Sequence, residues 1–279
     1  MATAIQRLER GDGAAEIAFA RLSDERTALA DLYQRAPCRV LTPKEEPGDP
    51  AQAVLLTTSG GIADGDKLSI KLRVGEGAAA TVTSQAAEKV YGARLADPAI
   101  IRVSLAVESG AWTEWLPQET ILFEGARLDR RTVAEVAPSG RLLACESVVF
   151  GRLARGERFG SGLLHDGWQV RRAGKLVWHD ALRLEGDIAA LIDRQASFDG
   201  AEAMATALYV ADDAAAHLDA ARALLGESVR SGVSVVNGIL IARWFGDALA
   251  VRRSLTAYLT EFRVVAAGLP ARLPRVWHC

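Results

Sequence analysis

The chain has 279 residues, of which 49% are hydrophobic and 24% are charged, a composition typical of folded globular proteins that argues against disorder. Its 33 lysines and arginines against 35 aspartates and glutamates give a formal charge of −2. This balance argues against binding to nucleic acid or to an anionic membrane by bulk electrostatics.

The first residues of the sequence and its cysteines favour a location in the cytoplasm. Residues 1–13 contain no apolar segment after a basic start, and no later segment is apolar over about 18 residues without a charge. We therefore expect neither a signal peptide nor a membrane span. Cys38, Cys145 and Cys279 are an odd number with no CxxC pair, which is typical of the reducing cytoplasm.

From about residue 14 to residue 185, apolar residues recur at every second position between turn-forming residues. Leu68, Ile70, Leu72 and Val74, for example, alternate with polar residues, as a half-buried strand requires. Turns are expected at residues 75–77 and 108–110. The sequence predicts strands at Lys67–Val74, Ala78–Thr83, Ile101–Val107, Thr120–Phe123, Thr132–Val136 and Arg141–Phe150.

Two hairpins are expected further along the chain. The segment Gly167–Trp178 has a tight turn at residues 173–175, and a second hairpin is centred on Asn237 and Gly238. Asn-Gly is the dipeptide that best tolerates the positive φ angles of a type I′ turn.

Helices are expected only in the C-terminal third. Apolar residues at helical spacing predict helices of about four turns at Ala211–Leu225 and at Arg252–Ala267, the latter ended by Gly268 and Pro270. Thr42–Gln52 is expected to be a surface loop. No break in composition marks a linker, so residues 1–279 are expected to form a single, mainly β domain with about two α-helices.

The common catalytic motifs are missing from the sequence. It contains no GxxxxGK[ST], no GxGxxG between a strand and a helix, no HExxH and no GxSxG, so nucleotide cradles, zinc-protease sites and nucleophile elbows are unsupported. The four histidines are widely scattered, which argues against a ready-made zinc site.

Three groups of side chains leave alternatives open. Acidic residues beside turns could bind a cation transiently or perform acid–base chemistry, or they could simply solvate strand ends. Arginine runs could be solvated strand faces or could pair with an acidic partner protein. Tryptophans could form a sugar platform, although core packing is favoured. The acidic residues are Asp64, Asp66, Glu88, Glu114, Glu119 and Glu124. The arginines are Arg127, Arg130, Arg131, Arg152, Arg155 and Arg158, and the tryptophans are Trp112, Trp115, Trp168 and Trp178.

Several segments, taken in order, resemble the urease accessory protein D family, also called accessory protein H. The resemblance covers nearly the whole chain and rests on five motifs in the family's order. They are TTSGGIADGDKL (Thr57–Leu68), TSQAAEKVY (Thr83–Tyr91), WLPQETILFEGA (Trp115–Ala126), GRLARGERF (Gly151–Phe159) and LPRVW (Leu273–Trp277).

The resemblance implies a β-rich fold whose sheets wrap in a layered, helical arrangement. It also implies a chaperone and not an enzyme: a protein that docks on apo-urease with accessory protein F and the GTPase accessory protein G, and that assists nickel insertion. The resemblance implies that no cofactor is tightly bound and that Ni²⁺ passes transiently through an internal conduit. Hydrolysis of GTP would then belong to the partner.

Within the matched motifs, Asp66 is the first candidate for lining this nickel passage, with Glu88, Ser84 and Glu119 as further candidates. The C-terminal helix and its tail are the first candidates for docking accessory protein F. Asp64 stands where many family members have a second small residue, and His165 stands in a variable stretch. His278 and Cys279 lie beyond the last motif, so the resemblance assigns none of these residues a role.

Two other classes of function stay open from the residues alone. A β-sandwich or barrel hydrolase or isomerase would use paired carboxylates such as Asp66 and Glu119 in one concave pocket. A carbohydrate-binding β module would need Trp168 and Trp178 exposed and coplanar on one face.

Overall fold

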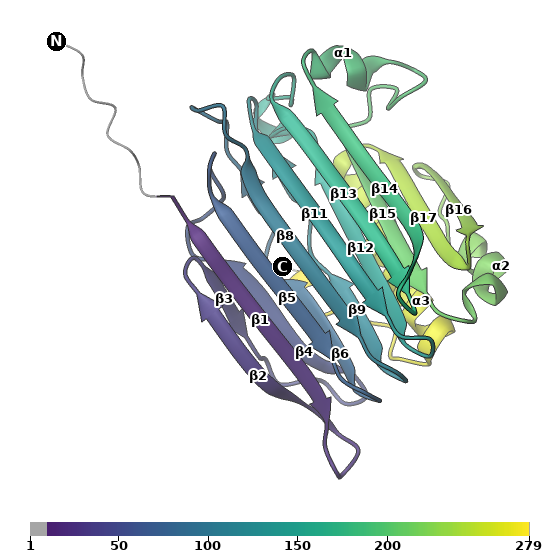
Figure 1. The fold of residues 1–279 in the computed structure, drawn as a ribbon. Coiled ribbons are helices and arrows are strands. Elements are labelled where there is room, and N and C mark those ends of the chain that lie inside the picture. Colours follow the sequence, from purple (N-terminus) through teal and green to yellow (C-terminus); the bar gives the residue numbers. More distant parts are fainter. Residues whose placement is uncertain (1–9, 279) are drawn as a thin grey trace.

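The structure is a computed structural model that describes residues 10–278. Two β-sheets lie face to face, and the long helix α3 (Ala248–Ala267) packs on the outer face of the second sheet (Figure 1). The predicted mainly β, layered fold is therefore confirmed. Among the described residues, no helix combines the length and the apolar character needed to cross a membrane.

The first sheet has seven strands in the order β14-β13-β11-β8-β5-β1-β2. Their bounds are β1 (Asp12–Arg21), β2 (Thr27–Arg35), β5 (Lys67–Val74), β8 (Ala99–Val107), β11 (Arg127–Val136), β13 (Leu163–Arg172) and β14 (Lys175–Glu185).

The second sheet has ten strands, eight of them in the order β16-β17-β15-β12-β9-β6-β4-β3, while β10 pairs with β12 and β7. Their bounds are β3 (Cys38–Leu41), β4 (Ala51–Thr57), β6 (Ala79–Ser84), β7 (Glu88–Val90), β9 (Trp112–Leu116), β10 (Thr120–Leu122), β12 (Arg141–Val149), β15 (Ala203–Val210), β16 (Arg230–Val236) and β17 (Ile239–Gly246).

The chain winds back and forth between the two sheets. It passes from β5 in the first sheet to β6 in the second, returns to β8, and continues through β9, β11, β12 and β13. The neighbouring strands that this winding places in one sheet, β5-β8-β11-β13 and β6-β9-β12, are consequently parallel. This is the helically wound arrangement that the resemblance implied.

The predicted turns stack at one end of this winding. Gly77 N donates to the carbonyl of Ser109 at 3.0 Å, and Gly110 N donates to Ser139 Oγ at 3.0 Å. Gly77 and Gly110 have φ angles of 63° and 67°, a region that L-residues with side chains avoid. These glycines therefore allow each tight passage from one sheet to the next.

The apolar core lies between the sheets, where the alternating residues meet. Leu68, Leu72 and Val74 of β5 are buried, as are the inward residues Ile101 to Val107 of β8. A second apolar cluster fills the space between the second sheet and α3. Trp112, Trp115, Trp168 and Trp178 are all buried in these two clusters, so core packing is confirmed for them.

Every strand expected from Lys67 to Phe150 is present, although β11 extends back to Arg127. Both predicted hairpins are confirmed as β13–β14 and β16–β17. Asn237 and Gly238 have φ angles of 49° and 77°, as a type I′ turn requires.

Two of the observed helical segments differ from the prediction. α3 begins earlier than expected because Asp247 caps it by accepting a hydrogen bond from Ala250 N. The helix expected at Ala211–Leu225 is wrong as a continuous element: it is a 3₁₀ turn, η2 (Ala214–His217), followed by the short α2 (Leu218–Ala223). Asp213 does not cap this segment, because its carboxylate is bound by Tyr209 Oη and His217 Nε2.

Three further elements are short. α1 (Ile188–Asp193), capped by Asp187, is too short to show helical periodicity in the sequence. The remaining 3₁₀ turns are η1 (Leu153–Arg155) and η3 (Arg275–His278). The prediction of a surface loop over Thr42–Gln52 is wrong for its last residues. β4 already begins at Ala51, and the Asp49 side chain is buried in ion pairs.

Candidate functional site

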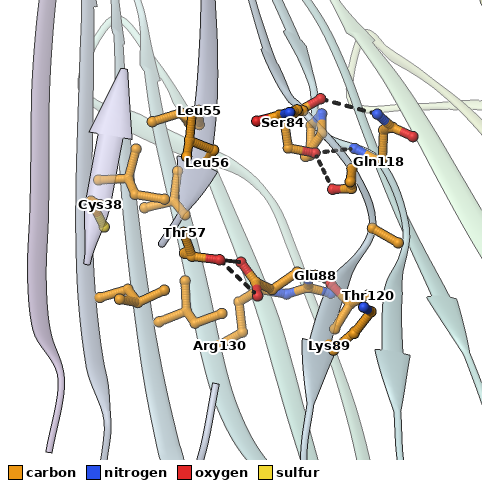
Figure 2. A pocket seen from close by; sticks show the side chains of 18 of the residues that line it. Cys38, Leu55, Leu56, Thr57, Ser84, Glu88, Lys89, Gln118, Thr120 and Arg130 are labelled. Carbon is orange, nitrogen blue, oxygen red and sulfur yellow. Dashed lines mark hydrogen bonds between the residues drawn. The ribbon is translucent and has the colours of Figure 1, made fainter. Parts of the chain in front are cut away.

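A cavity of about 250 Å³ lies between the two sheets, near the point where β7 and β10 extend the second sheet (Figure 2). Its walls are mostly apolar and come from both sheets. The polar side chains that line it include Thr57, Ser84, Glu88, Arg130 and Glu146. A concave apolar space with a few converging polar groups is the usual form of a binding site.

Glu88 faces this cavity because of the register of β7. Glu88 lies beside Thr120 of β10, and both residues line the cavity. Thr57 Oγ1 donates to the two carboxylate oxygens of Glu88 at 3.2 Å and 3.1 Å (Figure 2). Burial raises the pKa of Glu88 to about 7, although the Thr57 hydrogen bond opposes this shift. Near neutral pH, Glu88 can therefore exchange its proton for another cation.

A buried ion cluster forms the inner end of the cavity. Arg130 Nε lies 2.9 Å from Glu146 Oε1, and Arg130 Nη2 lies 2.6 Å from Asp166 Oδ2. Arg130 Nη1 also donates to Thr120 Oγ1 at 2.8 Å, and the indole of Trp168 donates to Glu146. Arg130, Glu146 and Asp166 are 6%, 8% and 9% exposed.

Two carboxylates share one guanidinium in this cluster, so its acidic charge is in excess. Burial and the nearby Asp166 raise the pKa of Glu146, while Arg130 opposes the shift. Burial also acts to lower the pKa of Arg130, but the two carboxylates outweigh it and raise that pKa. The excess charge can be compensated by a proton or by an added cation.

Glu146 connects this cavity to a smaller one of about 40 Å³, which Asp166, Asp180 and Thr206 also line. Oxygen-bearing side chains thus follow one another across the interior, from Glu88 through Glu146 to Asp180. Asp180 forms an ion pair with Arg243. Oxygen-bearing side chains therefore line two adjoining cavities, with Glu146 common to both.

The structure brings two of the four predicted nickel-passage residues together, because Glu88 and Ser84 line the same cavity. Ser84 Oγ donates to the carbonyl of Ala86 at 3.1 Å and accepts from Gln118 N at 2.9 Å. Ser84 therefore also fixes the backbone that forms the cavity wall.

Asp66 and Glu119 lie elsewhere. Asp66 accepts from Gly11 N at 2.7 Å and from Ala63 N at 2.8 Å, so its carboxylate closes a turn at the start of β5. Glu119 pairs with Arg252 and lines a groove on the outer face of the second sheet. A metal-binding role for these four residues stays a prediction.

The geometry does not favour the two alternative functions. Asp66 does not line the groove that contains Glu119, nor the cavity between the sheets, so these carboxylates do not form one acid–base pair. Trp168 and Trp178 are 7% and 8% exposed, and their ring planes differ by 52°. They cannot form the flat exposed platform that a sugar-binding surface requires.

The sequence analysis missed Arg130, Glu146 and Asp166. The expectation that Arg130 lies on a solvated face is wrong, because it is in phase with the buried residues Leu128 and Thr132 of β11. A charged residue on the apolar face of an alternating strand is the signal that could have identified it. Arg131, by contrast, is exposed as expected.

The other candidate ligands do not form a tight metal cage. Within residues 10–278, no group of three or more His, Cys, Asp or Glu side chains is placed to hold a metal ion. Cys38 lines the cavity, and burial together with the charge of Glu88 raises its pKa to about 11. Its thiol is therefore protonated at neutral pH and a weak ligand. Cys279 lies outside the described residues.

The sequence matches the family model described as UreD urease accessory protein over residues 11–278. The chain belongs to this family. Membership of this family means that the chain is an accessory protein that supports urease maturation.

Individual relatives agree with this assignment over nearly their whole length. The chain is 43% identical to the urease accessory protein UreD of Magnetococcus marinus, with 89% of this chain and 88% of the relative covered. It is 44% identical to the protein of that name from Azorhizobium caulinodans, covering 90% and 91%. Identity to the one from Methylobacterium sp. is 39%, covering 97% and 96%.

Proposed function

We propose that this chain is a non-catalytic, cytoplasmic subunit of a urease maturation complex. In this proposal it docks on apo-urease with accessory proteins F and G, and Ni²⁺ crosses its interior between the two sheets on the way to the urease active site. The supporting observation is that Glu88, Glu146 and the partly exposed Asp180 line two adjoining cavities, with Glu146 lining both.

The chemistry of these side chains favours passage over storage. A route for an ion must bind it strongly enough to let it enter and weakly enough to release it. Carboxylate and hydroxyl oxygens bind Ni²⁺ less tightly than a cluster of thiolates and imidazoles would. Glu88 and the cluster around Arg130 supply such oxygens, and an entering cation would displace the protons that the raised pKa values of Glu88 and Glu146 retain near neutral pH.

The energy for the transfer would come from a partner. Without a P-loop in its sequence, this chain has no recognisable cradle for GTP. We therefore assign GTP hydrolysis to accessory protein G and only the ion's path to this chain.

The test is reconstitution of urease activation from purified apo-urease, accessory proteins F and G, nickel, GTP and this chain. In the double variant Glu88→Gln with Glu146→Gln, the cavity keeps its shape but loses two carboxylates. We expect the activation rate to fall at least about tenfold, which corresponds to about 1.4 kcal/mol.

The matched control is Glu16→Gln with Glu135→Gln, which removes two carboxylates from surface ion pairs of the first sheet. This control should activate urease at the unmodified rate. Size-exclusion chromatography of each complex shows whether docking is intact. Full activation by the Glu88 and Glu146 double variant would refute the proposed ion path.

A further inference from the structure

A second hollow, here called the outer groove, lies on the face of the second sheet opposite to the cavity. It has a volume of about 410 Å³ and runs between η1 and the first turn of α3. The outer groove is defined by Lys89, Phe123, Arg152, Arg155, Leu249 and Arg252, with further residues of β10 and β12 between them. Its chemistry differs from that of the cavity.

The lining of the outer groove is strongly cationic. It contains Lys89, Arg152, Arg155 and Arg252 against the single acid Glu119, in a chain whose formal charge is −2. Arg252 is paired with Glu119, and Arg152 with Glu157. Lys89 and Arg155 are exposed and make no direct side-chain hydrogen bond or ion pair within residues 10–278. Two cations at this site are therefore available to a ligand.

The floor of the outer groove is apolar. Ile121, Val149 and Leu153 line it, and Leu249 at its edge is 53% exposed. Exposed leucine beside unpaired cations suits a ligand that carries both an apolar side chain and carboxylates. A free inorganic anion would leave this apolar surface in water.

The same lining argues against single-stranded nucleic acid. Such ligands stack their bases on exposed aromatic rings. Phe123 is covered on one side by the Arg152 guanidinium, whose central carbon lies 4.3 Å from the ring centroid, and it contacts Tyr91 edge-on at 5.1 Å. The ring is therefore already packed by this chain's own side chains.

We infer that the outer groove binds an acidic segment of a partner protein, with an apolar side chain of that segment against Leu249 and carboxylates on Lys89 and Arg155. The groove lies on the other face of the sheet from the cavity, since Glu88 and Thr120 line the cavity while Ile121 lines the groove, and Lys89 borders both spaces. The bound segment would lie directly behind the cavity wall. This inference does not depend on the path of nickel.

Fluorescence anisotropy with a defined probe tests the inference. The probe is a short fluorescein-labelled peptide with glutamates on both sides of a central Leu-Phe pair, and its twin has lysines in place of the glutamates. We expect the acidic peptide to bind, the basic twin not to bind, and the affinity to fall at least about fivefold between about 50 mM and about 300 mM salt.

The decisive variant is Lys89→Glu with Arg155→Glu, which should weaken acidic-peptide binding at least about tenfold. Leu249→Ser should weaken it about threefold or more without changing the charge. The matched control is Lys67→Glu with Arg131→Glu, two exposed cations on the outer face of the first sheet; it should bind the peptide like the unmodified protein. Thermal unfolding confirms that all variants are folded.

Three outcomes would overturn the inference. They are no binding of the acidic peptide, equal weakening by the control pair, and tighter binding of a single-stranded RNA than of the peptide. The assay contains neither nickel nor urease, so its failure would leave the proposed ion path unaffected, and failure of the activation assay would leave this surface unaffected.

Discussion

Two buried arginines lie in ion clusters on opposite faces of the second sheet, and the two clusters differ in their charge balance. Arg130 lies between the two sheets and faces Glu146 and Asp166. Arg263 lies between the second sheet and α3 and faces Glu114 and Asp49. The arginines are 6% and 1% exposed, so both clusters are removed from water.

The clusters differ in their charge balance and in the space beside them. Arg272 adds a second cation to the Arg263 cluster, with Nε 2.9 Å from Asp49 Oδ2, and the Thr81 hydroxyl donates to Glu114. Two cations thus meet two carboxylates, and Glu114 is fully buried. The Arg130 cluster has one cation for two carboxylates, and its Glu146 lines two cavities. The Arg263 cluster is thus balanced and packed, whereas the Arg130 cluster has one carboxylate more than cations and open space beside it.

The largest expected effect follows from removing the balanced arginine. Arg263→Met leaves Glu114 buried without its cation, and we expect the free energy of unfolding to fall by about 3–5 kcal/mol. Urea denaturation at neutral pH measures this loss. Arg272→Met is the control, because Asp49 keeps Arg263, and it should lose only about 1 kcal/mol. Equal losses for both variants would contradict this account of the cluster.

Arg130→Met should destabilise the protein in a pH-dependent way. The two carboxylates would then face each other without a cation, so the pKa of Glu146, which is already raised in the folded state, would rise further above its unfolded value. Stability is then retained at low pH and lost as the pH rises through the folded pKa values. We expect a loss of about 3 kcal/mol at about pH 8 and about half of that at about pH 5.

Urea denaturation at both pH values provides the measurement, with the Arg263 variant as the comparison. A loss for Arg130→Met that is the same at both pH values would show that the carboxylates do not take up a proton. It would remove the contrast between the two clusters.

Glu88 offers a smaller and more specific test of the cavity. Its pKa is raised to about 7 from 4.5, so the folded state binds the proton more tightly and stability falls as the pH rises between these values. Glu88→Gln removes this dependence. The variant should match the unmodified protein near pH 5 and exceed its stability by about 1–2 kcal/mol near pH 8.

The measurement for Glu88→Gln is the unfolding free energy at pH steps between these limits. Glu16→Gln, in an exposed ion pair with Lys71, should leave the pH dependence unchanged. If Glu88→Gln also leaves the pH dependence of stability unchanged, the pKa of Glu88 is not raised in the folded protein.

The smallest effect is expected at Glu119, outside the cavity. Its ion pair with Arg252 is partly exposed, so Glu119→Gln should cost no more than about 1 kcal/mol of unfolding free energy. Urease activation should be unaffected, since the outer groove and the cavity lie on opposite sides of the sheet. If Glu119→Gln abolished urease activation without lowering stability, Glu119 would have to be assigned to the ion's path after all.

The repeating β architecture follows from local sequence patterns. Alternation such as Leu68 to Val74, the stacked glycine turns and the Asn237-Gly238 hairpin are local patterns, and each was confirmed. The apolar residues of α3 recur at helical spacing, which is also a local pattern, so this helix could be predicted too. Five motifs in order also pointed to the family before any contact was known. The prediction that Glu88 and Ser84 line the ion's path rests on these motifs and not on geometry.

Only the tertiary structure decided which charged residues meet inside. Nothing near Arg130 in the sequence shows that its partners are Glu146 and Asp166, and Arg263 and Glu114 are 149 positions apart. The segment at Ala211–Leu225 likewise has helical spacing, but Tyr209 takes the carboxylate that could have capped it. Strand periodicity is a property of neighbouring residues and records which face is buried. Pairing across the two sheets depends on how the winding brings distant strands into register, and on the cost of burying a charge without a partner.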